Sequence, residues 1–367
     1  MKFTPFYKIH KCLNAKMGLF GGYQMPIQYS GGVKEEHMSV RENLGVFDVS
    51  HMGEFVIYGP NSFKLLQYIC SNDIKKLFPG KAQYNYLPND NGGIIDDLIV
   101  YQLKKDKYLL VVNASNIEKD WKWINKCNKD FNAKISNISD QTALLAIQGP
   151  KAIEAMQPLC NINLKDLGNF FHKNSRFAGF DNILVAKTGY TGSGGIEIYF
   201  DTRYAEKIWD KIMIAGNSFG ISPIGLAARD TLRIEMGYCL YGHEINETTS
   251  PISAGLGWIT KTETEFINYE SHKKSIECGT DSKLIAFEMD ARGIPRSGYC
   301  IFDEKENLIG KVTSGTQSPL LNKGIGMGYV KSNFSANGKK LYIGIREKFI
   351  PCTVVKPPFY KIKKDKN

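Results

Sequence analysis

The sequence predicts an α+β protein of two or three domains. At 367 residues the chain is longer than one ordinary domain. Amphipathic helices and apolar strands are mixed up to about residue 275, and from about Leu284 onward short strands and Gly/Pro turns replace the helices. The second pattern is typical of a small all-β barrel or sandwich. We therefore expect one α/β region over residues 1–275 and a C-terminal all-β domain, a barrel or a sandwich, over residues 276–367.

Composition narrows the class of protein. Hydrophobic residues make up 43% and charged residues 23% of the chain, as in soluble globular proteins. No apolar run approaches the ~20 residues that span a bilayer, and the N-terminus has neither a secretory nor a transit character. We expect a cytoplasmic protein without a membrane partner. The net charge of +10 suits an acidic partner. No basic-aromatic motif indicates nucleic acid.

Cofactor signals are missing from the sequence. The eight cysteines are scattered singly without a CxxC, and the six histidines form no HExxH or HxxxH pair. We expect reduced thiols and no metal. No GxxxxGK[ST] occurs, and the glycines of 189–195 and 324–328 do not have the spacing of a dinucleotide fingerprint. Neither ATP nor NAD or FAD is indicated.

Periodicity places the main elements along the chain. Thr4-Pro5 is expected to open a first helix that runs to about Lys16. Apolar residues at spacings of three and four predict further helices over three segments, 61–70, 117–128 and 204–215. Buried strands are expected over 143–148, 183–188 and 196–200. A further helix is expected to begin at about Gly225.

The stretch from residue 81 to 113 is expected to be a hairpin or a meander of short strands, around which the rest of the chain is organised. Turn signals at 88–93 separate two apolar runs, and Asp96 and Asp97 interrupt the second run. Adjacent side chains on a strand point to opposite faces. One reading is that one aspartate faces water and the other caps a turn or meets an arginine. The other reading is that one aspartate faces a pocket and handles a proton or a positive charge there, because a buried carboxylate is costly unless it is paired.

Other candidate site residues each allow a structural and a functional interpretation. Glu197 is a carboxylate inside an apolar strand and is either outward-facing or a ligand contact. Arg229 and Arg233 lie four apart on one helix face, where an intrahelical salt-bridge network is the simpler reading. His51 has no visible nucleophile partner and is expected to be structural. Four more polar side chains stand at strand ends or loops, where ligand pockets and ordinary cores both use such residues: Tyr84, Asn113, Tyr190 and Tyr238.

Many ordered motifs resemble one known family, the T-protein (aminomethyltransferase) of the glycine cleavage system, along nearly the whole chain. The matching segments include 22–26, 47–54, 92–100, 112–116, 145–150, 189–192 with Glu197, 225–233, 239–242, 293–296 and 312–316. The resemblance implies a three-lobed folate-binding fold around a central channel. Two interleaved α/β lobes would come from the first ~275 residues, and a C-terminal β-barrel would form the third.

The resemblance also implies an activity. A T-protein moves the one-carbon unit from the aminomethylated lipoyl arm of the H-protein to tetrahydrofolate, giving 5,10-methylenetetrahydrofolate, ammonia and dihydrolipoyl H-protein. It implies that Asp96 is the catalytic carboxylate, with Asp97 pointing the other way into a structural pair. Glu197 would bind the pterin edge and Arg229 an anionic or carbonyl group of the folate. The remaining expected folate contacts are Met52, Tyr84, Asn113, Tyr190, Arg233 and Tyr238.

Two alternatives stay open. A folate-dependent demethylase or oxidase module shares the fold, but such modules usually come fused to a flavin domain, which this chain does not have. A non-catalytic folate or H-protein binder belongs to a different class. At the C-terminus, Tyr360 is a doubtful substrate contact, and the lysines at 361, 363, 364 and 366 form the only cluster of basic residues.

Overall fold

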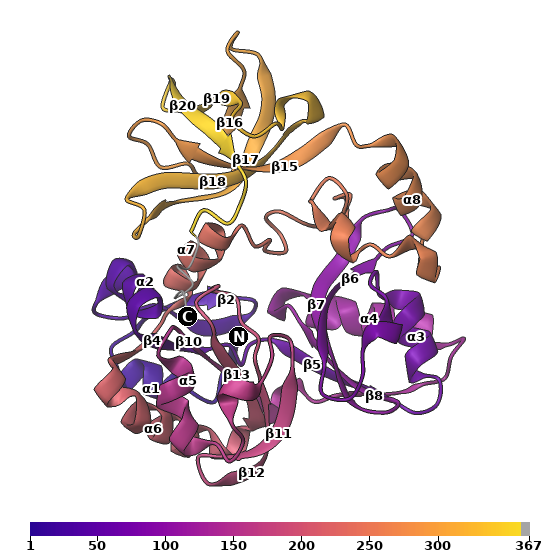
Figure 1. Cartoon of the computed structure of the whole chain (residues 1–367), viewed down its shortest axis with the longest axis vertical. Coiled ribbons are helices and arrows are strands. Elements are labelled where there is room, and N and C mark those ends of the chain that lie inside the picture. Colours follow the sequence, from indigo (N-terminus) through magenta and orange to yellow (C-terminus); the bar gives the residue numbers. More distant parts are fainter. Residues whose placement is uncertain (361–367) are drawn as a thin grey trace. The chain divides into compact units, whose positions relative to one another are not determined.

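The computed structural model describes residues 1–360 (Figure 1). The lysine cluster of the tail therefore lies outside the described residues. The chain divides into two compact units. Unit 1 consists of Met1–Tyr86 and Asp96–Arg229, and unit 2 consists of Leu87–Ile95 and the chain from Asp230 onward. Unit 2 thus begins at Asp230, upstream of the boundary expected at residue 275. It also includes the segment Leu87–Ile95 of the meander.

Unit 1 contains two mixed α/β layers built around two sheets. The six-stranded sheet has the order β11-β12-β13-β10-β4-β14. Its strands are β4 (Leu44–Asp48), β10 (Thr142–Gln148), β11 (His172–Phe177), β12 (Phe180–Ala186), β13 (Gly195–Asp201) and β14 (Ile221–Pro223). The five-stranded sheet has the order β6-β7-β8-β5-β9. Its strands are β5 (Gly53–Tyr58), β6 (Ala82–Pro88), β7 (Ile94–Lys104), β8 (Lys107–Val112) and β9 (Lys134–Asn137).

The two sheets are interleaved along the chain. The chain leaves the six-stranded sheet after β4, builds the whole five-stranded sheet, and returns at β10. This confirms the two interleaved lobes. Strands β6, β7 and β8 are neighbours in the sheet and form a meander, but β7 is 11 residues long and not a short strand. A small third sheet has the order β1-β3-β2, with β1 at Lys2–Phe3, β2 at Lys16–Phe20 and β3 at Tyr23–Gln28.

Most of the predicted helices are confirmed. The helices of the first 236 residues are α1 (Tyr7–Cys12), α2 (Gly32–Glu42), α3 (Ser62–Ile69), α4 (Ile117–Asn128), α5 (Ala152–Met156), α6 (Ala205–Gly216) and α7 (Leu226–Met236). The first predicted helix is wrong at both ends. Thr4 does not cap it, because its hydroxyl donates to the Asp48 carboxylate at 2.6 Å, and Lys16 already belongs to β2.

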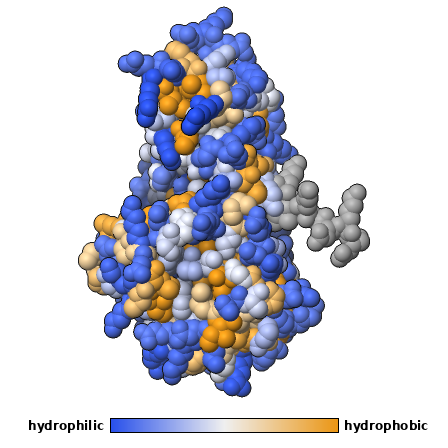
Figure 2. Space-filling model, turned by 90° about the vertical axis from the view of Figure 1, so that its left-hand side faces the viewer, coloured by the Kyte–Doolittle hydropathy of each residue, from blue (hydrophilic) through white to orange (hydrophobic). Residues whose placement is uncertain are grey.

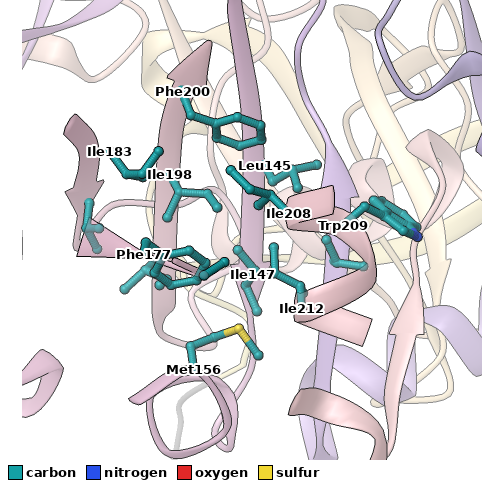
Figure 3. Close-up of a cluster of buried hydrophobic side chains, with 14 of the residues drawn as sticks. Leu145, Ile147, Met156, Phe177, Ile183, Ile198, Phe200, Ile208, Trp209 and Ile212 are labelled. Atoms are coloured by element: carbon teal, nitrogen blue, oxygen red, sulfur yellow. The ribbon is translucent and has the colours of Figure 1, made fainter. Parts of the chain in front are cut away.

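The main hydrophobic core of unit 1 lies between the six-stranded sheet and its helices. Strand alternation sends Ile196, Ile198 and Phe200 of β13 to one face, where they meet helix α6. Figure 3 shows Ile198 and Phe200 on the side of the sheet that carries helix α6, whose apolar stripe consists of Ile208, Trp209 and Ile212. The opposite face of β13 carries Glu197 and Tyr199. One face of this sheet therefore packs against helices, and the other face carries polar side chains.

The C-terminal part of unit 2 is a closed barrel with the strand order β15-β18-β17-β16-β19-β20. Its strands are β15 (Ser282–Met289), β16 (Cys300–Phe302), β17 (Leu308–Ser318), β18 (Lys323–Lys331), β19 (Lys340–Ile345) and β20 (Lys348–Val355), and helix α8 (Tyr269–Cys278) precedes them. The predicted β-barrel is confirmed. The glycines at 324–328 lie in β18, and a Cβ on Gly326 would come within 2.6 Å of the Phe287 ring. These glycines thus permit close packing.

Polar groups dominate the visible surface. Hydrophilic side chains cover most of the face shown in Figure 2, with hydrophobic residues in smaller patches between them. Within residues 1–360, no helix combines the length and the apolar character needed to cross a membrane. All eight cysteines lie in the described part of the chain, and none forms a disulfide.

Candidate functional site

Strand β7 brings the two adjacent aspartates into very different surroundings. Asp96 is fully buried (0% exposed). Its carboxylate accepts hydrogen bonds from the Asn113 backbone N–H at 2.9 Å, from Asn113 Nδ2 at 2.9 Å and from Asn116 Nδ2 at 2.5 Å. These donors stand where β8 ends and α4 begins. Asp96 therefore anchors the strand to the following helix.

Asp97 points to the opposite face and is partly exposed. The Tyr84 hydroxyl donates to its Oδ2 at 2.9 Å, and Asn113 Nδ2 donates to its Oδ1 at 2.8 Å. Burial, reinforced by the neighbouring Asp96 charge, raises the pKa of Asp97 to about 7. A carboxyl group with a pKa near neutrality can exchange a proton under ordinary conditions. Asp97, of the two, has the character of an acid–base group.

This arrangement reverses the expected orientation of the pair. The sequence-based assignment gave Asp96 the open face and Asp97 the structural pair. The structure places Asp96 in the buried amide network and Asp97 on the accessible face, beside the Tyr84 hydroxyl. The expectation of opposite faces is confirmed, but the choice of face is wrong. The reason is physical: alternation fixes that the two differ, whereas the positions of Asn113 and Asn116 decide which carboxylate is buried.

A chain of hydroxyl groups joins the polar faces of the two sheets in unit 1. Tyr101 lies on the same face of β7 as Asp97, four residues along. Its hydroxyl lies 2.9 Å from the Tyr199 hydroxyl and 3.1 Å from Thr188 Oγ1. Thr188 in turn donates to the Glu197 carboxylate. Glu197 and Asp97 thus belong to facing sheets that buried tyrosines hold together.

Glu197 is held as a partly accessible carboxyl group. Thr188 and Tyr199 are its hydrogen-bond partners. Burial raises the pKa of Glu197, while the Thr188 bond and the Arg229 charge act in the opposite direction. The Glu197 side chain is partly exposed and is also hydrogen-bonded to Thr188, so it is not a simple solvent-facing strand residue. Such a group can accept hydrogen bonds from a planar ligand with N–H donors.

Arg229 and Tyr190 stand together at this region. The Arg229 guanidinium lies over the Tyr190 ring, 4.6 Å from its centre, and both side chains are partly exposed. Arg41 holds the loop that contains Tyr190. Its guanidinium donates hydrogen bonds to the Thr191 carbonyl and to Ser193 Oγ, each at 2.6 Å. The structure therefore brings Glu197, Arg229 and Tyr190 into one neighbourhood.

The other predicted residues divide between the two units. In unit 1, Asn113 bridges the two aspartates, and the partly buried Met52 sits in the turn between β4 and β5. Arg233 and Tyr238 belong to unit 2. The Arg233 guanidinium is 1% exposed and is bonded to Asp230, Glu244, Ser314 and the Tyr238 carbonyl. Only the Asp230 ion pair is intrahelical, as in the simpler reading, and the other partners lie outside α7. We assign Arg233 a structural role because its guanidinium is buried and bonded on all sides.

Sequence reasoning missed several buried groups near the site. Tyr101 and Tyr199 were not singled out, because aromatic residues inside strands are usually core. Glu54 is fully buried, and within residues 1–360 its carboxyl oxygens have no hydrogen-bond partner. Burial raises the pKa of Glu54 well above its ordinary value. Burial also lowers the pKa of His51 to about 4, and this ring packs against Phe20 and Tyr23 as a neutral imidazole.

The site has the chemistry of organic ligand binding and proton transfer. Two carboxyl groups with raised pKa values, an arginine stacked on a tyrosine, and a hydroxyl chain suit a polar heterocycle. Among the described residues, no cluster of three or more His, Cys, Asp or Glu is arranged to hold a metal ion.

Comparisons with known proteins agree with this chemistry. The family model described as the GCVT N-terminal domain matches residues 6–264, and the glycine cleavage T-protein C-terminal barrel domain matches residues 283–361. An aminomethyltransferase of Flavobacterium psychrophilum is 56% identical over 98% of this chain and 100% of its own length. One of Bacteroides fragilis is 53% identical with the same coverage.

A solved structure extends the agreement to the fold. The crystal structure of glycine cleavage system aminomethyltransferase T from Bartonella henselae has a TM-score of 0.92 and 32% identity, and the match covers 98% of each chain. This confirms the predicted α+β class with its lobes and C-terminal barrel. The chain therefore belongs to the glycine cleavage T-protein family and is an enzyme of the aminomethyltransferase type.

Proposed function

We propose that this chain transfers the one-carbon unit of an aminomethylated, lipoyl-bearing H-protein to tetrahydrofolate, with Asp97 as the acid–base group. One observation supports the choice of residue above all others. The Asp97 carboxyl is partly exposed, is held by Tyr84 and Asn113, and has a pKa raised to about 7. Asp96 is fully buried behind amide donors.

Glu197 and Arg229 support tetrahydrofolate as the acceptor. The pterin ring presents N–H donors along one edge, and the partly accessible Glu197 carboxyl can accept them. Thr188 and Tyr199 fix the orientation of that carboxyl. Arg229, stacked on Tyr190, offers a cation for a carbonyl or carboxylate group farther along the ligand. The residues present therefore fit a folate co-substrate.

The reaction balances without an outside oxidant or reductant. The transferred carbon loses its bonds to the lipoyl sulfur and to the amine nitrogen, and it forms bonds to two folate nitrogens. The two folate N–H protons end on the dihydrolipoyl sulfur and on the departing ammonia. An ionised Asp97 would accept one such proton and pass it on, which is general acid–base catalysis. Its negative charge would also stabilise the positive charge that develops at the carbon.

The net charge supports the protein partner. A carrier that delivers a swinging lipoyl arm must dock transiently, and opposite charges steer such encounters. The +10 charge of this chain suits an acidic carrier.

The test is a comparison of donors with the purified, full-length chain. We expect methylenetetrahydrofolate and ammonia in equal amounts from aminomethylated H-protein. Product from an N-methylated amine together with an added flavin dehydrogenase, which supplies the two-electron oxidation of the methyl group, and without H-protein, would favour the demethylase alternative. Folate binding without turnover of either donor would favour the non-catalytic binder.

A further inference from the structure

A buried glutamine lies inside the loop that contains Tyr190. This loop, residues 187–194, connects β12 to β13, and three of its eight residues are glycines. Glycine loses more conformational freedom on folding than any other residue, so the loop needs contacts beyond its own backbone to keep one shape. Gln148, the last residue of β10, supplies such contacts and is 2% exposed.

The side-chain amide of Gln148 is hydrogen-bonded to the chain on both sides of Tyr190. Its Nε2 donates to the Thr188 carbonyl at 3.2 Å and to the Ile196 carbonyl at 3.3 Å, near the two ends of the loop. Its Oε1 accepts from the Thr191 hydroxyl at 3.0 Å. The amide therefore holds the chain shortly before Tyr190 and directly after it.

The loop also packs against this amide, at Gly189. A Cβ on Gly189 would come within 2.0 Å of Gln148 Oε1, which is far closer than non-bonded atoms approach. A side chain at this position could therefore enter only by displacing the glutamine. Packing and hydrogen bonds together fix the path of the chain on the side of β10.

Tyr190 is the loop residue that turns away from these buried contacts. The Thr191 hydroxyl, which donates to Gln148, also accepts the Ser193 backbone N–H at 3.2 Å. Thr191 is 0% exposed, whereas the neighbouring Tyr190 is partly exposed, and its ring contacts the Arg229 guanidinium. The contacts of Gln148 thus fix the part of the chain from which the Tyr190 ring projects toward Arg229.

We propose that Gln148 is a positioning residue for the folate co-substrate, because it holds the loop so that the Tyr190 ring stays against the Arg229 guanidinium. The inference rests on the proposed function, in which Tyr190 and Arg229 belong to the folate site. The simpler interpretation is that Gln148 only satisfies polar groups of a buried loop and contributes to stability. The two interpretations differ in what Gln148 does to folate binding once Tyr190 is removed.

The expected effect is on ligand binding and not on the chemical step. A loop without its internal contacts must be ordered when the ligand binds, and this cost is subtracted from the binding free energy. Asp97 does not depend on the loop, because it is held by Tyr84 and Asn113 from other elements. Once tetrahydrofolate is bound, the step assigned to Asp97 should therefore proceed at its usual rate.

The test is calorimetric titration of the full-length chain with tetrahydrofolate, together with turnover of aminomethylated H-protein. Gln148→Met keeps the length of the side chain and removes the hydrogen bonds of its amide. It should weaken tetrahydrofolate binding roughly 10-fold and leave kcat at saturating tetrahydrofolate within about 2-fold of wild type.

Gln157→Met is the matched control. Gln157 bridges another loop of unit 1 in the same way, since its Nε2 donates to the Ile162 carbonyl at 2.9 Å and its Oε1 accepts the Leu164 N–H at 2.8 Å. Gln157→Met should lower the midpoint of thermal unfolding and leave the affinity for tetrahydrofolate unchanged.

A double-mutant cycle with Tyr190→Ala separates the two interpretations. Tyr190→Ala alone should weaken binding, and adding Gln148→Met should then cost less than about 3-fold more, because the residue through which Gln148 acts is gone. An undiminished further loss would mean that Gln148 acts on folate by another route. Unchanged affinity in Gln148→Met, or a fall in kcat as large as the loss of affinity, would also overturn the proposal.

A milder variant covers the case in which Gln148→Met does not fold. Thr191→Val removes only the hydroxyl that donates to Gln148 Oε1, and it should weaken tetrahydrofolate binding roughly 3-fold. Unchanged affinity in Thr191→Val overturns the proposal. The proposed function fails separately, if the wild-type chain neither binds tetrahydrofolate nor uses it. Tyr190→Ala with wild-type affinity would overturn the inference alone.

Discussion

Replacement of Asp97 by asparagine should make the protein more stable at alkaline pH. Asp97 has a pKa raised from 3.8 to about 7, so the folded protein binds this proton more tightly than the unfolded chain does. Stability therefore falls as the pH rises from about 4 to about 7. The cost is fully present above pH ~7 and absent below pH ~4. Asparagine keeps the shape and removes this cost.

The size of the effect follows from the shift. Three pKa units correspond to about 4 kcal/mol at ~1.36 kcal/mol each. Asp97 is partly exposed, so solvent screening reduces the expected gain to ~2 kcal/mol. At roughly 2–4 °C per kcal/mol for a unit of this size, the midpoint of thermal unfolding should rise by ~4–8 °C at pH 8.5.

The assay is thermal unfolding of wild type and Asp97→Asn between pH 4.5 and pH 8.5. The difference between the two midpoints should shrink steadily toward the acidic end. Asp96→Asn is the matched control, because it makes the same chemical change one residue away. It should lower the midpoint, since it disturbs a fully buried carboxylate that accepts three amide hydrogen bonds. A destabilised Asp97→Asn with a neutral Asp96→Asn would refute the reasoning.

Four further predictions concern the ligand, the partner and the two cores. Glu197→Gln should weaken tetrahydrofolate binding by ~2 kcal/mol, because a charged hydrogen bond is lost; an unchanged affinity in calorimetric titration would remove Glu197 from the site. Arg233→Ala should destabilise unit 2 by ~3–5 kcal/mol in urea unfolding, since it leaves Glu244 buried without its partner. A stable variant with reduced folate affinity would instead support the original assignment of Arg233. Ile198→Ala should cost ~2–5 kcal/mol by opening a cavity in the core beneath α6, and a much smaller loss would mean that this core repacks. The Michaelis constant for H-protein should rise between 0.1 M and 1 M salt, as the Debye length falls from ~10 Å to ~3 Å; a constant value over that range contradicts electrostatic docking.

Local patterns predicted the elements well where packing and periodicity agree. The apolar residues at helical spacing over 117–128 predict helix α4 with the bounds that the structure shows, because this spacing places them on one face of a helix. The run of short strands after Leu284 predicts a barrel or a sandwich, and the family resemblance selects the closed barrel that the structure has. Thr4 failed as a cap because a buried partner from another strand, Asp48, competes for its hydroxyl.

The site was harder to predict because its geometry depends on residues far apart in the chain. Alternation along β7 separates Asp96 from Asp97, but the burial of Asp96 depends on amide donors that follow β8. The Tyr101–Tyr199 contact joins residues 98 positions apart, and neither tyrosine has a local signal. Family resemblance pointed to this region of the chain. The structure was needed to choose between neighbouring side chains.

The most direct test of the account is the turnover of Asp97→Asn and Asp96→Asn with aminomethylated H-protein and tetrahydrofolate. Asp97→Asn should retain folate binding and its fold, while methylenetetrahydrofolate formation falls roughly 10²–10⁴-fold. Asp96→Asn should lose stability first and retain much more activity per folded molecule. A folded Asp97→Asn with wild-type turnover, beside a folded Asp96→Asn with none, would contradict the account.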